Sequence, residues 1–111
     1  MPIQRSRIRF LDDQVPNNDG YRSYLKDRVL AFAEEDPDNH GLASCVAAIV
    51  QNCGHSSVSD RRNHATVKFY VVGADGKAQF LVTQHVTCLK YRTWSQRQQR
   101  RRRGGGGGGS R

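Results

Sequence analysis

The chain has 111 residues, of which 36% are hydrophobic and 25% charged, and its formal net charge is +8. This length allows one modest domain, and no stretch approaches the roughly 20 consecutive apolar residues of a membrane-spanning helix. Residues 1–10 lack the apolar segment of a secretory signal peptide. We therefore expect a protein of the cytoplasm, the nucleus or both, with no membrane partner.

The positive charge is concentrated at the C-terminal end. Residues 1–87 hold ten Lys or Arg and ten Asp or Glu, whereas residues 88–111 hold eight Lys or Arg and no acidic residue. A neutral body with a cationic tail is typical of a protein that binds a polyanion, because the body folds without self-repulsion while the tail supplies the attraction. A tail that only keeps the protein soluble is the alternative, but solubility does not require arginine in place of lysine.

The first 35 residues predict a basic segment and then a helix. Residues 1–10 carry arginines at every second position from Arg5 to Arg9, which predicts either a basic N-terminal arm or a short edge strand. After a loop, Asp19 is the expected N-cap of a helix that runs to about Glu35. Pro37 ends this helix, because proline disfavours helical geometry in the residue before it. The apolar stripe of the helix is Tyr21, Leu25, Val29 and Phe32.

A second helix is predicted over residues 42–53. Its apolar residues follow the three-four spacing of a buried helical face, and Gly54 stands where a left-handed C-cap belongs. The residues in this pattern are Leu42, Cys45, Val46, Ile49, Val50 and Cys53.

Residues 65–72 and 78–89 read as two strands joined by a two-residue turn at Asp75-Gly76, a strong signal for a β-hairpin. The turn sets the register. The core face then pairs Val71 with Phe80, Phe69 with Val82, and Val67 with Gln84. The opposite face pairs Val72 with Gln79, Tyr70 with Leu81, Lys68 with Thr83, and Thr66 with His85.

A lone hairpin leaves both of its edges unpaired and is marginally stable. The face with Tyr70, Val72 and Leu81 is also too apolar for plain exposure to solvent. We therefore predict an α+β fold in which two helices pack on the hairpin and homodimerisation through these three residues completes a four-stranded antiparallel sheet. An N-terminal strand is the alternative partner. The predicted organisation is a basic arm or edge strand at 1–10, an α+β module at 11–91 and a disordered Arg/Gly-rich tail at 92–111.

The tail predicts RNA binding. A guanidinium group offers a fork of donors that matches phosphate oxygens, and interleaved aromatic rings give unstacked bases a platform, which favours RNA or single strands over duplex DNA. The arginine run also fits a nuclear localisation signal. The predicted nucleic-acid-binding residues are Lys90, Tyr91, Arg92, Trp94, Arg97, Arg100, Arg101, Arg102, Arg103 and Arg111, extended by Arg5, Arg7, Arg9, Arg61 and Arg62.

Metal binding and catalysis have less support. Cys53-x-His55 and His85-x-x-Cys88 have the ligands of two zinc half-sites. However, residues three apart on a regular strand point to opposite faces, with Cys88 on the core face. We therefore expect reduced structural cysteines and no metal. The chain has no glycine-rich phosphate loop and no nucleophile elbow, which predicts a protein that is not an enzyme and uses no cofactor.

Three segments, residues 45–52, 56–60 and 65–72, resemble the dimerisation domain of arterivirus-type nucleocapsid proteins. In that family a helix precedes a hairpin, and two hairpins form one sheet. The resemblance implies a viral, virion-associated protein that packages RNA as a homodimer, although the basic region here follows the domain and does not precede it. The alternative resemblance is to small basic plant-virus proteins that suppress RNA silencing. It implies a regulatory factor or nuclear effector that uses the tail as a nuclear localisation signal.

Overall fold

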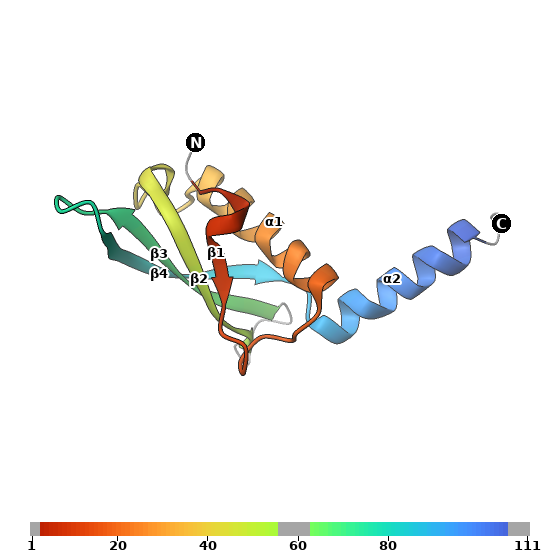
Figure 1. The fold of residues 1–111 in the computed structure, drawn as a ribbon. Helices are drawn as coiled ribbons and strands as arrows, with labels where there is room; N and C mark the ends of the chain where they lie inside the picture. Colours follow the sequence, from red (N-terminus) through yellow and green to blue (C-terminus); the bar gives the residue numbers. More distant parts are fainter. Residues whose placement is uncertain (1–2, 56–62, 107–111) are drawn as a thin grey trace.

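A four-stranded mixed sheet and two helices make up the α+β fold in the computed structural model, which describes residues 3–55 and 63–106 (Figure 1). The elements in chain order are η1 (Arg5–Arg7), β1 (Ile8–Phe10), α1 (Asp19–Glu35), η2 (Leu42–Ser44), β2 (Cys45–His55), β3 (Asn63–Val72), β4 (Ala78–Cys88) and α2 (Tyr91–Gly106). In the described part of the chain, no helix is long and apolar enough to cross a membrane.

The sheet has the strand order β1-β2-β3-β4. β1 runs parallel to β2, and the two other pairs are antiparallel. Helix α1 covers one face, so the core lies between one helix and one sheet face. The largest fully buried side chains of this core are Tyr21, Phe69, Ile3, Leu25, Leu42, Val29, Val50, Val67, Val86 and Cys45.

Helix α1 forms as predicted, with a different N-cap. The side chain of Asn18, one residue before Asp19, accepts a hydrogen bond from the N–H of Tyr21 at 2.9 Å. The buried stripe ends with Ala33, while Phe32, predicted for this stripe, is half-buried and stacks on Phe69 with ring centroids 6.3 Å apart.

Asp36 ends helix α1 in the left-handed conformation, with φ 45°. Its carboxylate accepts hydrogen bonds from the backbone N–H groups of His40, Gly41 and Leu42 at 2.9, 2.9 and 3.2 Å. Partial loss of hydration raises the pKa of this carboxyl, but the three donors outweigh it, and the net pKa is lowered. Asp36, the residue before the proline, thus stabilises the turn that leads into η2 by accepting its backbone hydrogen bonds.

The helix predicted over residues 42–53 is wrong, because this segment forms η2 and then strand β2. Three irregularities in the pairing with β3 insert extra residues into β2. The inward-facing residues are therefore Cys45, Ala48, Val50 and Cys53, with gaps of three, two and three. This spacing imitates a helical stripe. The segment 45–52, which carries the resemblance to the nucleocapsid domain, is part of this strand.

The predicted hairpin is confirmed, but its turn has three residues and not two. The Gly73 N–H donates to the Lys77 carbonyl at 2.7 Å, and Gly76 takes φ 81° in the loop between them. The longer loop shifts the neighbouring pairs by one residue. A bulge between the pairs of Phe69 and Tyr70 then restores the predicted register.

The pairs beyond the bulge are as predicted: Phe69 with Val82, Val67 with Gln84, Lys68 with Thr83, and Thr66 with His85. The three pairs next to the turn are wrong, because Val71, Tyr70 and Val72 pair with Gln79, Phe80 and Ala78.

The predicted antiparallel sheet completed by a second copy is also wrong in its construction. One chain supplies all four strands, since β2 pairs with β3 and the N-terminal strand β1 pairs in parallel with β2. The hairpin therefore has only one open edge, strand β4, within the described residues.

The basic tail, expected to be disordered from residue 92, is helical in α2 to Gly106. Arginine and glutamine have high helix propensity, and the cations near its C-terminal end match the helix dipole. Residues 107–111 lie outside the described part of the chain.

Candidate nucleic-acid interface

Helix α1 holds the junction between β4 and α2 through two tyrosine hydroxyls. The N–H of Leu89 donates to the Tyr24 hydroxyl at 2.8 Å, and the Tyr21 hydroxyl donates to the carbonyl of Leu89 at 2.7 Å. Arg28 adds a third bond, from its Nε to the Thr87 carbonyl at 3.0 Å. Both backbone groups of Leu89 are thus satisfied by one helix, which fixes the point where the chain leaves the sheet.

Four aromatic side chains join α2 to α1, and we call them the aromatic clamp: Tyr21, Tyr24, Tyr91 and Trp94. The Tyr21 ring lies 5.9, 5.2 and 5.5 Å from the centroids of Tyr24, Tyr91 and Trp94. Gly20 lets the indole approach α1. A side chain at this position would place its Cβ only 2.9 Å from Cη2 of Trp94. Such contacts contribute both apolar burial and ring–ring attraction.

The clamp changes the interpretation of Trp94. The sequence predicts a stacking platform for bases, whereas the structure packs the half-buried Trp94 against Tyr21 and Tyr91. Its contacts make it the anchor of α2. Tyr91 remains at the surface, with 36% of its area exposed.

From Lys90 to the end of α2, every charged residue is a lysine or an arginine. Figure 1 shows the helix leaving the body beside the start of α1 and continuing away from the sheet. Lys90, Arg92, Arg97 and Arg100 are exposed. The ion pairs found within the described residues are Arg5–Asp27 and Arg22–Asp12, so these four cations are not neutralised by a carboxylate there. The backbone of α2 also includes Arg101, Arg102 and Arg103.

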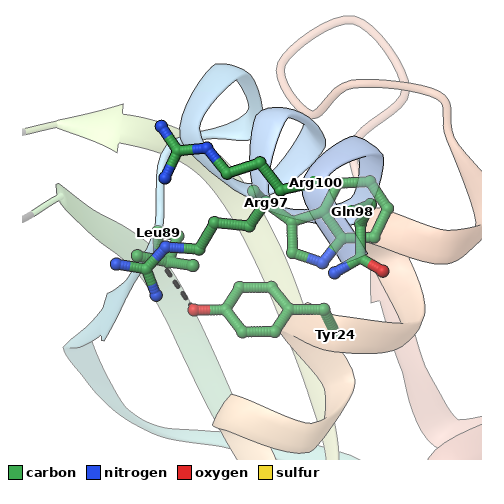
Figure 2. Close-up of a pocket in the computed structure, with 6 residues that line it drawn as sticks. Tyr24, Leu89, Arg97, Gln98 and Arg100 are labelled. Carbon is green, nitrogen blue, oxygen red and sulfur yellow. Dashed lines mark hydrogen bonds between the residues drawn. The ribbon is translucent and has the colours of Figure 1, made fainter. Parts of the chain in front are cut away.

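A pocket of about 650 Å³ opens between α1 and α2. Figure 2 shows the side chain of Arg97 extending toward Leu89 and Tyr24, whereas the side chain of Arg100 extends along α2 with its guanidinium group away from Tyr24, and Gln98 lies at the other end of the Tyr24 ring. Its lining residues are Tyr24, Leu89, Trp94, Arg97, Gln98 and Arg100. Sequence reasoning included the two arginines and Trp94 but missed Tyr24, Leu89 and Gln98, since only the packing of α2 against α1 brings them together.

The remaining predicted arginines are separated from this pocket or have other partners. Arg5 forms an ion pair with Asp27 and donates to the carbonyl and hydroxyl of Ser23, so it staples the N-terminal segment to α1. Arg7 and Arg9 are exposed in η1 and β1. The predicted positions Arg61, Arg62 and Arg111 lie outside the described residues.

The sheet face opposite α1 carries the residues predicted for a dimer interface. Val72 and Leu81 are 54% and 37% exposed, and half-buried Tyr70 packs edge-on against Phe80 at 6.0 Å. Phe80, itself 51% exposed, was assigned to the core face by the sequence. The register shift beside the turn moves it to this outer face.

The three cysteines lie in the sheet as free thiols, buried or half-buried. Cys45 and Cys88 are buried, and burial raises the pKa of both thiols and of Cys53. His85 is exposed, whereas Cys88 is buried, which confirms their predicted separation to opposite faces. Within residues 3–55 and 63–106, no three His, Cys, Asp or Glu side chains are grouped as metal ligands.

Comparison with known proteins identifies no relative: no family model matches the chain, and neither a curated protein nor a solved structure is significantly similar to it.

Proposed function

We propose that this chain is an RNA-binding protein that presents α2 as an arginine-rich helix on a neutral α+β body. The observation that carries the proposal is the difference between the two ends of α2. Its first turn is fixed to the body by the aromatic clamp, while the exposed cations that follow have no carboxylate partner within the described residues. An anchored helix holds its positive charge at one place, which suits a polyanion better than it suits solubility alone.

Phosphate contacts give this binding its character. Arginine forks pair with phosphate oxygens without reading the bases, so we expect affinity for many RNA sequences. Such tolerance fits RNA packaging of the nucleocapsid kind. The alternative is a regulatory factor, such as a silencing suppressor or nuclear effector, in which the run from Arg100 to Arg103 serves as a nuclear localisation signal.

The salt dependence of RNA binding tests the proposal. Each phosphate contact contributes about −0.7 to the slope of log affinity against log salt for single strands. Replacing Arg101, Arg102 and Arg103 with glutamine keeps helix propensity and removes three charges. We expect the slope to become less negative by about 2.

The matched control removes three lysines from the body, with the substitutions K26Q, K68Q and K77Q. We expect this triple variant to keep the wild-type slope. If the arginine triple variant binds RNA with the wild-type affinity and slope, the segment from Arg101 to Arg103 is not the RNA site. The tail is then a targeting or solubility element, and the regulatory reading takes precedence.

We propose further that a second copy of the chain pairs along β4, which combines an open edge with neutral composition. All 11 residues from Ala78 to Cys88 lack Asp, Glu, Lys and Arg. Edge strands are usually protected by such charges, and none is present here to repel an identical strand across a two-fold axis. Exposed Phe80 and Leu81 lie on this strand. Near its end, Arg28 already occupies the Thr87 carbonyl, so the half of β4 nearest the turn is the part available.

A further inference from the structure

We propose that the pocket between α1 and α2 binds one nucleotide unit of single-stranded RNA, with the base against Tyr24 and the phosphate paired with Arg97 and Arg100. This inference rests on the proposed RNA binding and names the unit that the body itself recognises. A volume of about 650 Å³ lies in the usual range of small-molecule sites.

The flat part of the pocket is built before any ligand arrives. Tyr24 is held at its hydroxyl by the Leu89 N–H at 2.8 Å, and its ring stacks on Tyr21. The ring therefore has a fixed orientation where it lines the pocket with Leu89 and Trp94. A preorganised aromatic surface is what an unstacked base needs, and such stacking tolerates every base.

The charged part of the pocket lies on α2. Arg97 and Arg100 are three residues apart, so they share one side of the helix, and both line the pocket. No acidic residue lines it, and neither arginine has a carboxylate within ion-pair distance among the described residues. Two guanidinium groups beside an aromatic surface match an anionic group joined to a flat ring.

Gln98 supplies the third feature, because its amide offers both donors and an acceptor to the edge of a base. Free phosphate makes no use of the aromatic surface. In duplex RNA the bases are stacked within the helix and do not reach Tyr24. The combination of two cations, a fixed ring and an amide thus fits a single-stranded nucleotide.

Trp94 reports occupancy of the pocket, since it is the only tryptophan of the chain and lines this pocket. The first experiment titrates the full chain with adenosine monophosphate, uridine monophosphate or inorganic phosphate and follows tryptophan fluorescence. Both nucleotides should change the emission at concentrations where phosphate does not. An equal response to phosphate overturns the nucleotide assignment and leaves an anion site only.

The second experiment compares R97Q with K77Q, which removes one charge from the loop between β3 and β4, outside the pocket. R97Q should weaken nucleotide binding by about tenfold or more, the loss typical of a hydrogen bond to a charged group, whereas K77Q should leave it unchanged within about twofold. Equal losses in the two variants overturn the pocket in favour of general charge attraction.

RNA binding measured by anisotropy separates the two proposals. If wild-type protein binds single-stranded RNA with a steep salt slope while neither nucleotides nor RNA alter Trp94 emission, the pocket is wrong and RNA binding by α2 stands. If the chain binds no RNA at low salt, the proposed function fails, whatever the nucleotides do.

Discussion

Leu89 is the residue through which the body controls the direction of α2. Its N–H and carbonyl meet two tyrosine hydroxyls that are one helical turn apart on α1. The two hydroxyls therefore satisfy backbone groups that a neighbouring strand or a helix cap would otherwise satisfy. The rings also belong to the aromatic clamp, so hydrogen bonding and apolar packing act on the same junction.

Removing either hydroxyl should loosen this junction. We expect Y21F and Y24F each to lower the free energy of unfolding by about 0.5–1.5 kcal/mol, the usual net value of one hydrogen bond. Urea denaturation followed by circular dichroism measures the loss. A control substitution, Y70F on the outer sheet face, should have a smaller effect. Equal stability of all four proteins would show that the Leu89 bonds do not hold the junction.

Gly20 tests the packing of Trp94 on α1. Alanine normally stabilises a helix relative to glycine by up to about 1 kcal/mol. Here the added Cβ lies 2.9 Å from the indole, so G20A should displace Trp94, lower stability and shift its emission to longer wavelength.

The same change made in a W94A background removes the clash. In that background we expect G20A to raise stability by about 0.5–1 kcal/mol, because only the propensity gain remains. If G20A stabilises both backgrounds equally, the indole does not contact α1 as described.

At the scale of elements, the sequence predicted those with regular local signals. The stripe from Tyr21 to Val29 and the proline at residue 37 predicted α1 and its end, while the predicted N-cap, Asp19, was one residue from the observed cap at Asn18. The hairpin followed from its alternation and its Asp-Gly turn. Beyond the bulge the register was right, because the bulge cancelled the error of one residue in loop length.

Strand β2 shows why the rest could not be predicted. Its bulges come from pairing with β3, a tertiary contact, yet they change the inward positions to the spacing of a helix. For α2, the polar composition suggested disorder, and the partner that orders its first turn lies some 70 residues earlier in α1, as the 73-residue separation of Asn18 and Tyr91 illustrates. The pocket forms only where α2 packs against α1. The sequence therefore predicted its arginines but not Tyr24 and Leu89, which line it from the other side.

The core between α1 and the sheet also makes the free energy of unfolding depend on pH. Burial raises the pKa of the thiols of Cys45, Cys53 and Cys88 and of the Tyr21 hydroxyl, so the fold favours the protonated forms. Stability from these groups is fully present below the unfolded thiol pKa of 9.0 and is lost as pH rises toward the raised values.

We therefore expect the free energy of unfolding to fall above pH 9, measured by urea denaturation between pH 7 and 10.5 under reducing conditions. The C45A variant should start less stable and decline less steeply over that range. A stability that rises or stays constant above pH 9 would contradict the burial of these groups.

At the scale of the whole molecule, the two proposed surfaces lie on different parts of the fold. The proposed RNA binding would use α2 and its junction with α1, while the proposed pairing with a second copy would use β4 and the exposed residues near the turn. A dimer built this way carries two arginine-rich helices. Two linked sites on one RNA raise the overall affinity without any new contact, provided that the strand spans them.

Substitution of Leu81 provides the test of this arrangement. We expect light scattering to show a dimer for the wild-type chain at micromolar concentration and a monomer for L81K. A lysine on the edge strand opposes pairing, because it is either repelled by the same lysine of the second copy or loses its hydration in the interface. L11K is the matched control, since Leu11 is similarly exposed, at 41% against 37%, and lies outside the sheet. L11K should remain dimeric, and L81K should still bind short RNA through α2 but lose the added affinity for long RNA. A wild-type monomer at high micromolar concentration, with its circular dichroism spectrum intact, rules out pairing through β4.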